Sequence, residues 1–369
     1  MPQAELSFPD IVSAILASNA NAFAVSGVCS KGLTSRSYTY DPSQIGSVST
    51  DLGDGQLTEA VCTLLRYGGR SVTAFPVAPT VDSTCGAVSK NGGSGPTISV
   101  AGLAASGDVL IDGPYDSLHV ALKVTKGGAE GTAKFQYCTD DLTVAGSHVG
   151  SFSGDVTVPA AKAAEIVGTV DLSTISSWGN GGTLDTLTFK IDSDSTTEVT
   201  VTFSDPADPA AVVTQINDQN GSGTKFLAAL VGSNKLAIYS ITTGTTGTLT
   251  IGNGTANSAL GFTTSAAASG TAATYTIPGT GVVCTFASGT YVLGDYYTFA
   301  TYAPRIEPAA VSGIFTRVRT AITEGAAIGA VWLPQEDADT IDGRSMLNAI
   351  STALTDARSA KIFLWGLYQ

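Results

Sequence analysis

The residue types that could perform chemistry are few and scattered in this chain of 369 residues. The two histidines, His119 and His148, cannot form a multi-histidine metal site by themselves. His119 lies inside an alternating, strand-like run, where a surface or packed position is expected rather than a catalytic base. The sequence has no HExxH helix, no GxSxG nucleophile elbow and no Walker loop. The histidines and these motifs therefore indicate no catalytic centre.

Two aspartate pairs could in principle bind calcium. They are Asp140-Asp141 and, separated by one residue, Asp192 and Asp194. Both pairs lie in turn-like sequence, where an aspartate side chain bonds its own backbone, and neither has the spacing of an EF-hand loop. Turn formation is therefore the expected role of both pairs, with calcium binding as the alternative.

A third acidic group follows a predicted buried strand. Glu336, Asp337 and Asp339 stand at the end of that strand, a place where α/β active sites often form. They also occupy the first turn of a predicted helix, where the helix dipole favours negative charge. We expect helix capping, and keep an enzyme that uses these carboxylates as the weakest alternative.

Glycine-rich and aromatic stretches have structural explanations too. Asn91–Gly95 and Asn180–Gly182 lack the strand–loop–helix context of a phosphate cradle and are predicted to be linkers. A set of aromatic side chains could form a sugar platform, but its alternating placement favours cross-strand packing. Its members are Tyr291, Tyr296, Tyr297, Phe299 and Tyr302. We therefore predict no catalytic, cofactor-binding or metal-binding residues, and no enzyme.

The chain is organised around the stretch from Asp54 to Val77. Its apolar residues recur at helical spacing, Gly68-Gly69 supplies the left-handed positions that end a helix, and Ser71–Val77 is a short β-type run broken by Pro76. The residues of the apolar helix face are Leu57, Val61, Leu64 and Leu65. Before this helix, Phe23, Val25 and Val28 suggest a strand. These patterns predict the first half of an α/β unit.

The second half of that unit is predicted far down the chain. Pro308 suits the first turn of a helix, Ile328–Leu333 is a continuous apolar run typical of a strand covered on both faces, and a second helix spans residues 341–354. A strand over Lys361–Leu367 follows. Strand, helix and strand in this order predict a right-handed parallel crossover.

Between the two halves lies sequence typical of all-β protein. Residues 90–158 carry alternating runs joined by a turn-rich KGGAEG connection, which predicts a small β-sandwich. A second β unit follows, opened by a helix-forming patch at Pro159–Val167 and containing a helix over Asp205–Asn217. The run from Thr274 to Pro304 is strand-like and is placed in this second unit.

The sequence thus predicts an α+β multidomain protein: a discontinuous α/β core, with a parallel or mixed sheet and flanking helices, carrying a large all-β insertion of two β-sandwich-like units. The domain assignment is 1–80 for an N-terminal arm and the first half of the core, 81–158 for the β-sandwich insertion, 159–304 for the second β-rich unit, and 305–369 for the second part of the core.

Composition excludes some partners. The net charge of −13 and the pI of about 4.4 leave little positive charge for nucleic acid or anionic membranes, and no apolar run is long enough for a membrane span. The N-terminus has no basic residue before its apolar stretch, unlike a secretory signal. Five scattered cysteines without CxxC spacing predict buried thiols made in a reducing compartment. With only 13% charged residues, the surface suits burial against other subunits, although secreted adhesins share this composition.

Several stretches resemble contractile phage tail sheath proteins and their relatives in contractile injection systems. GDGQLTEAVCTLLRYGGRSVTAFPV (53–77) is similar to the family's helix, glycine pair and strand, and residues 95–141 are similar to its glycine-rich β-insertion. GVVCTFASGTYVLGDYYTFATYAPR (281–305) resembles the motif that closes the insertion. The helix–strand–helix run from Pro308 follows in the family's order. These pieces cover most of the chain outside residues 160–280.

The resemblance implies a structural subunit that stacks in helical rings around a tail tube and changes its contacts when the tail contracts. Its partners are then neighbouring subunits and the tail tube protein, with baseplate and tail terminator proteins as further expected partners and no nucleic acid. Its location is the virion, after assembly in the bacterial host cytoplasm. Family members continue past the second crossover, so the core is expected to be truncated at its C-terminus. The alternative is a tail-associated, β-rich adhesin that binds the host surface.

Overall fold

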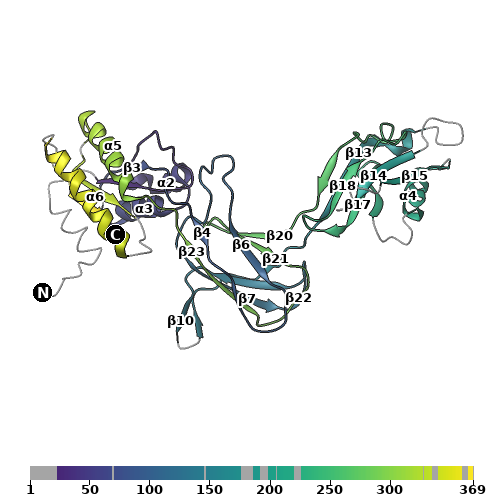
Figure 1. The fold of residues 1–369 in the computed structure, drawn as a ribbon, viewed down its shortest axis with the longest axis horizontal. Helices are drawn as coiled ribbons and strands as arrows, with labels where there is room; N and C mark the ends of the chain where they lie inside the picture. Colours follow the sequence, from purple (N-terminus) through teal and green to yellow (C-terminus); the bar gives the residue numbers. More distant parts are fainter. Residues whose placement is uncertain are drawn as a thin grey trace.

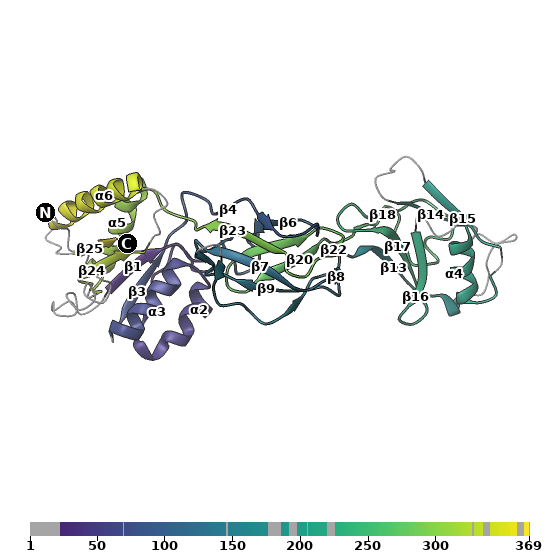
Figure 2. The ribbon, with the colours of Figure 1, turned by 90° about the horizontal axis from the view of Figure 1, so that it is seen from below.

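The fold consists of three bodies that follow one another along the longest axis (Figure 1). The computed structural model describes residues 23–68, 70–144, 147–175, 186–191, 198–204, 206–219, 226–326, 328–334, 340–359 and 365–368. The body that contains both ends of this described chain carries most of the helices, and the other two bodies are mainly β (Figures 1 and 2). The predicted multidomain α+β class is therefore confirmed.

The first body is built on a mixed sheet of five strands in the order β2-β3-β1-β24-β25. β1 pairs in parallel with both β3 and β24, β24 pairs in parallel with β25, and β2 runs antiparallel to β3. The strands are β1 (Phe23–Gly27), β2 (Tyr38–Tyr40), β3 (Val72–Pro76), β24 (Ala330–Leu333) and β25 (Trp365–Tyr368). The sheet therefore joins two chain segments that lie on either side of the long β insertion.

Helices cover both faces of this sheet (Figure 2). One face packs against α2 and α3, whose buried residues include Leu52, Leu57 and Val61, and the other packs against α5 and α6 through Phe315 and Ile350. The helical elements are η1 (Pro42–Gln44), α2 (Ile45–Leu52), α3 (Gln56–Gly68), η3 (Pro308–Ala310), α5 (Val311–Thr323) and α6 (Thr340–Ser359). The apolar stripe expected from Asp54 onward is thus a buried helix face.

Arg317 ties α5 to the end of β3. Its guanidinium donates hydrogen bonds to the carbonyl of Pro76 at 2.7 Å and to the carbonyl of Arg36 at 2.9 Å, and it lies 5.6 Å from the ring centre of Phe75. Burial lowers the pKa of this guanidinium, which nevertheless stays charged because its ordinary pKa is so high. Pairing this half-buried cation with two carbonyl oxygens fixes the helix against the sheet.

Replacing Arg317 with methionine is expected to lower the free energy of unfolding of the first body by about 2 kcal/mol, because the carbonyl oxygens of Pro76 and Arg36 lose a charged donor. The measurement is native-state hydrogen exchange of the β3 amides. Arg319→Met on the same helix is the matched control and is expected to cost less than about 0.5 kcal/mol. Equal protection of the β3 amides in both variants would show that the hydrogen bonds of Arg317 contribute nothing to the stability of the first body.

The middle body is a pair of packed sheets. Its larger sheet has the order β12-β9-β7-β23-β4 with β5 also paired to β23, and it faces the small sheet β20-β21-β6. The strands are β4 (Thr84–Cys85), β5 (Ser89–Asn91), β6 (Ile98–Gly102), β7 (His119–Lys126), β8 (Gly128–Ala129), β9 (Lys134–Cys138), β10 (Leu142–Val144), β11 (Ser147–Val149), β12 (Val156–Thr157), β20 (Ala273–Ile277), β21 (Val282–Phe286), β22 (Thr290–Tyr291) and β23 (Tyr296–Tyr302). One buried hydrophobic cluster fills the space between the sheets, and in it the ring centres of Phe135 and Phe286 lie 5.0 Å apart.

The pairing differs from the sequence assignment of residues 273–304. These residues were placed in the second β unit, but β21 pairs with β6, and β23 pairs with β7, so they belong to the middle body. Their alternating pattern predicts strands correctly, yet periodicity is local and does not identify the strand that lies alongside. The chain therefore enters the third body after residue 158 and leaves it before residue 273.

The third body packs one helix against two sheets, β13-β17-β16 and β15-β14-β18-β19. Its elements are β13 (Ala163–Asp171), η2 (Leu172–Thr174), β14 (Thr186–Ile191), β15 (Glu198–Thr202), α4 (Pro209–Asp218), β16 (Phe226–Val231), β17 (Lys235–Thr243), β18 (Thr248–Ile251) and β19 (Ala267–Ser269). Helix α4 overlaps the helix predicted over Asp205–Asn217 but begins at Pro209, which lies in its first turn, and the Asp208 side chain accepts from the Ala211 amide at 2.8 Å.

The helix predicted at Pro159–Val167 is wrong. Residues 163–171 form strand β13, which pairs with β17. Alanine favours helix, but Ala164 on this strand is fully buried in the core of the third body, and tertiary packing overrides propensity in such a case. Among the described residues, no helix has the length and apolar character to cross a membrane.

Candidate functional site

Two of the predicted acidic residues lie beside His119 at the start of β7. The amide of Asp141 donates to the carbonyl of His119 at 2.8 Å, and the imidazole is exposed. Asp140 accepts from the thiol of Cys138 at 2.8 Å and from the amide of Ser151 at 3.1 Å. These two hydrogen bonds lower the pKa of the Asp140 carboxyl. The turn interpretation of this pair is therefore supported by its backbone contacts.

A shallow groove of about 440 Å³ opens beside these residues. Its polar lining consists of Ser89 from β5, His119 from β7, Thr298 from β23 and the buried Asp141. Within the part of the chain that the structure describes, no cluster of three or more His, Cys, Asp or Glu side chains could hold a metal ion. The groove can offer hydrogen-bonding groups to a polar ligand.

Several predicted residues lie outside the described residues. They are Asp192, Asp194, Glu336, Asp337, Asp339 and the run Asn180–Gly182. His148 falls in β11, where the backbone alone is described. Their assigned roles stay predictions.

The aromatic set divides between core and surface. Tyr291, Tyr297 and Phe299 are buried in the core of the middle body, so cross-strand packing is confirmed for these three. The hydroxyl of Tyr297 donates to the carbonyl of Pro96 at 2.6 Å. Tyr296 lies edge-on to Phe152 at 6.0 Å on the outer face. The five residues therefore do not form one continuous platform.

The run Asn91–Gly95, predicted to be a linker, wraps around a buried carboxylate. Asp295, at the start of β23, is 1% exposed, accepts from the Gly93 amide at 2.7 Å and forms an ion pair with Lys90 at 3.2 Å. A Cβ atom at Gly95 would lie 2.3 Å from the Asp295 carboxylate. The glycines are needed because backbone approaches the acid closely. Sequence analysis did not predict this contact because its residues are far apart in the chain. The Gly294-Asp295 pair, next to a strand-like run, was the one local feature that pointed to a tight turn there.

All five cysteines are free thiols, three of them buried. Burial raises the pKa of Cys29 to about 11 and that of Cys284 to about 12, with Cys138 also raised to about 11. A thiol with so high a pKa is protonated and unreactive at neutral pH.

We therefore expect a thiol reagent to label the folded protein only at the half-buried Cys62 and Cys85, and slowly. All five thiols should react after unfolding. The measurement is intact mass spectrometry during labelling with iodoacetamide, with peptide mapping to assign the sites. Fast labelling of Cys284 in the folded protein would contradict the burial described above.

A second, more enclosed pocket lies at the joint between the first and middle bodies. Two chain segments cross this joint side by side, because the amides of Thr80 and Val81 donate to the carbonyl of Arg305, and the Arg305 amide donates to the carbonyl of Val81. A third segment reaches across from the middle body, where the Leu110 amide donates to the carbonyl of Ser30 at 2.6 Å. These contacts set the walls of the pocket.

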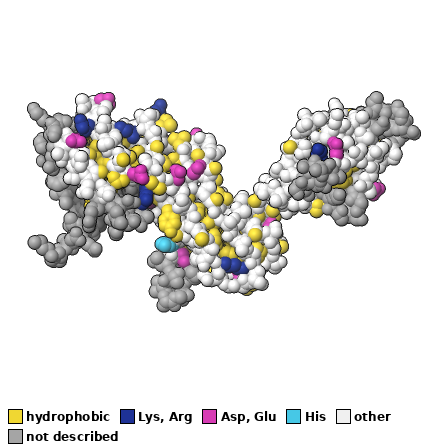
Figure 3. Space-filling model, viewed as in Figure 1, with side chains coloured by type: hydrophobic (Ala, Val, Ile, Leu, Met, Phe, Trp, Pro, Cys, Tyr) yellow, Lys and Arg dark blue, Asp and Glu magenta, His cyan; other side chains and the backbone are white. Residues whose placement is uncertain are grey.

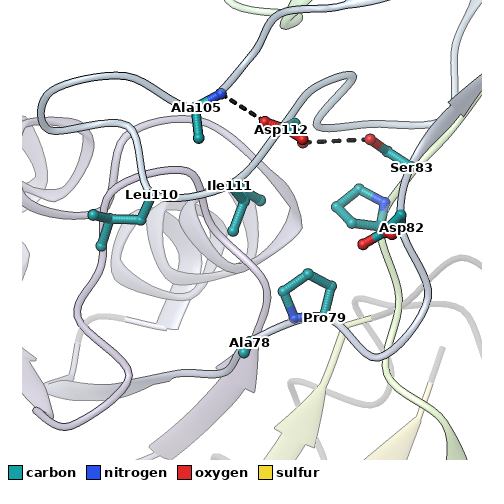
Figure 4. Close-up of a pocket in the computed structure, with 9 residues that line it drawn as sticks. Ala78, Pro79, Asp82, Ser83, Ala105, Leu110, Ile111 and Asp112 are labelled. Carbon is teal, nitrogen blue, oxygen red and sulfur yellow. Dashed lines mark hydrogen bonds between the residues drawn. The ribbon is translucent and has the colours of Figure 1, made fainter.

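This joint pocket has a volume of about 340 Å³ (Figure 4). Its apolar walls come from Pro79, Leu110, Ile111 and Pro304, with two alanines. Its polar groups are Asp82, Ser83 and Asp112. Small-molecule sites commonly fall between about 300 and 1,000 Å³ and occur at domain joints.

Hydrogen bonds fix one side of the joint pocket. The Asp112 carboxylate accepts from the Ala105 amide at 2.6 Å, and the Ser83 hydroxyl donates to the backbone carbonyl of Asp112 at 3.3 Å (Figure 4). Nearby, burial raises the pKa of Tyr115, and the charges of Asp54 and Asp112 raise it further. The sequence offered no signal for this pocket, since its walls come from three separate segments.

Comparisons with known proteins give structural neighbours only. No family model matches the chain, and no curated protein matches it. The flagellar cap protein of Escherichia coli is 12% identical over 74% of this chain and 67% of its own, with a TM-score of 0.25. A flagellar cap structure from Serratia marcescens is 16% identical over 57% of this chain and 92% of its own, with a TM-score of 0.26.

A sheath tail protein from Listeria innocua is also similar in structure. It is 10% identical over 96% of this chain, with a TM-score of 0.23, and the match spans 50% of the Listeria protein. The structural neighbours are thus a tail sheath protein and flagellar cap proteins. Because the TM-scores are all below 0.5, the function proposed below rests on this chain's own sequence and geometry.

Proposed function

We propose that this protein is a structural subunit of a contractile tail sheath. It polymerises in helical rings around a tail tube and changes its inter-subunit contacts on contraction. The subunit is assembled in the cytoplasm of a bacterial host and belongs to the virion. Neighbouring copies and the tube protein are its main partners, and baseplate and terminator proteins bind at the ends. The sequence motifs described above support this assignment.

The observation that carries the proposal is the open edge of the first-body sheet. Among the described residues, β25 pairs on one side with β24 and has no strand on its other side. An unpaired edge presents a row of backbone donors and acceptors, which recruits a strand from another chain. Such pairing gives a directional contact that repeats from copy to copy, as a helical assembly needs.

The shape and the surface support the same role. The middle and third bodies extend away from the first body along one axis (Figures 1 and 2), so first bodies can stack without hindrance from the insertion. On the face drawn in Figure 3, charged side chains are sparse and separated. Only 13% of all residues are charged, and little charge has to be desolvated when such a surface is buried.

The experiment is sedimentation velocity of the purified full chain over a wide range of concentration and salt, followed by negative-stain electron microscopy. We expect a concentration-dependent shift from monomer to large assemblies that appear as rings or tubes. A protein that stays monomeric under every condition contradicts the proposal.

A second candidate function is host-surface binding, favoured by the groove beside His119 on the middle body. Its hydroxyl, imidazole and carboxylate groups suit a polyhydroxyl ligand such as a glycan. The full chain is probed on a glycan array alongside a Ser89→Ala/His119→Ala variant. Binding that this variant loses would support an adhesin, and an array without signal removes that candidate.

A further inference from the structure

We propose that the joint pocket is a receptor for the side chain of a lysine or arginine on a partner protein subunit. The inference stands apart from the sheath assignment, because it concerns the chemistry of a pocket within one copy of the chain. It follows from the combination of apolar walls, two carboxylates and the position of the pocket at the joint.

The first step is the apolar part of the pocket. Pro79 and Pro304 come from the two crossing segments, and Leu110 and Ile111 from the loop between β6 and β7. Leu110 is 45% exposed, so a large apolar side chain remains in contact with water at the pocket. A long aliphatic stem placed there would remove that surface from water, which is favourable.

The second step is charge. In Figure 4 the Asp82 side chain points into the pocket, toward the side occupied by Pro79 and Ile111. Neither Asp82 nor Asp112 takes part in an ion pair with any residue that the structure describes. Two exposed carboxylates beside apolar walls complement a cation carried on an aliphatic stem.

The third step is the choice between a basic side chain and a metal ion as the cation that occupies the pocket. A calcium or magnesium ion needs about six oxygen ligands, whereas two carboxylates and one hydroxyl line this pocket, and an ion gains nothing from the apolar walls. A guanidinium binds carboxylates through directed hydrogen bonds, and arginine is enriched at protein interfaces. The matching occupant is therefore a basic side chain from another protein subunit.

Occupancy has a mechanical consequence. The walls belong to both crossing segments and to the loop that contacts Ser30 in the first body. A side chain seated there bridges these three segments and restricts motion of the middle body relative to the first body. A partner that inserts a basic side chain thereby fixes the direction in which the β insertion projects.

The test uses N-acetyl-arginine amide as the probe and N-acetyl-citrulline amide as its neutral match of the same shape. Each is titrated into the full chain carrying labelled Ile and Leu methyl groups, and the NMR signals of Leu110 and Ile111 report binding. We expect saturable shifts with the arginine probe and binding at least about tenfold weaker with the citrulline probe.

Asp82→Asn, alone and with Asp112→Asn, is expected to weaken arginine binding by about tenfold or more. Asp108→Asn, an exposed residue of the same loop that does not line the pocket, is the control and should leave binding unchanged. Unshifted Leu110 and Ile111 methyl groups up to the solubility limit overturn the proposal. Equal binding of both probes, or wild-type binding by Asp82→Asn, overturns it as well. Asp82→Asn keeps the Asp112 hydrogen bonds, so its fold is preserved.

Discussion

Replacing Asp295 with alanine is expected to raise the hydrogen-exchange rates of the β7 and β23 amides about a hundredfold, which corresponds to about 3 kcal/mol of lost stability in the middle body. Removing the carboxylate leaves the Lys90 ammonium, whose side chain is 20% exposed, without its counter-charge. It also leaves the Gly93 amide without its acceptor. Leaving a buried charge unpaired costs more than the pair itself contributes.

Asp155→Ala is the matched control for this experiment. Asp155 is an exposed aspartate of the same body that accepts from Thr125 at 2.9 Å and Gln136 at 3.1 Å, and its loss should cost less than about 1 kcal/mol. Adding Lys90→Met to Asp295→Ala should restore part of the protection, because the unpaired charge is then gone. Equal exchange in the Asp295 and Asp155 variants would contradict the account.

We expect that proline at one of two adjacent positions in β25 abolishes assembly and leaves the fold of the monomer intact. In a strand, successive residues direct their N–H groups to opposite sides. Gly366 and Leu367 stand opposite Val331 and Trp332 in the β24–β25 ladder, so one of their amides faces β24 and the other faces the open edge. Proline lacks the N–H group and is tolerated at an edge.

The two substitutions, Gly366→Pro and Leu367→Pro, therefore control each other. One should lower the unfolding temperature by removing a ladder bond, and the other should keep that temperature but lose the large species in sedimentation velocity. If the variant with the unchanged unfolding temperature assembles like the wild type, β25 is not the assembly edge.

Much of the local structure was predictable because it depends on patterns within one segment. The apolar residues of α3 recur at helical spacing, and the apolar run of β24 is uninterrupted, as in a strand that is buried on both faces. Each pattern therefore indicates both the type of element and its burial. Helix α4 overlaps its predicted range and has Pro209 in its first turn, as predicted. In these cases the side-chain pattern, the capping residues and the burial agree, so the local sequence is sufficient to predict the element.

Long-range pairing was not predictable in the same way. Residues 273–302 show the alternation of strands, but nothing in them identifies β6 and β7 as neighbours. Ala164 has a helix-favouring neighbourhood, and only the core of the third body makes its segment a strand. Propensity is a weak prior that burial overrides.

The two sites most informative about this molecule were also not predictable from single segments. The buried Asp295 contacts Lys90 and Gly93, which are distant in sequence, and the lining of the joint pocket comes from the segments around Pro79, Asp112 and Pro304. Their side chains are ordinary surface types in sequence. Only the meeting of three chain segments at the joint places two carboxylates beside proline and leucine.

The most direct test of the assembly proposal is a three-dimensional electron-microscopy reconstruction of the particles formed by the full chain. We expect stacked rings or tubes in which first bodies of neighbouring copies touch and an additional strand runs beside β25. Assemblies joined only through the third bodies, with the β25 edge in solvent, would contradict the proposal. So would a field of dispersed monomers at every concentration and salt.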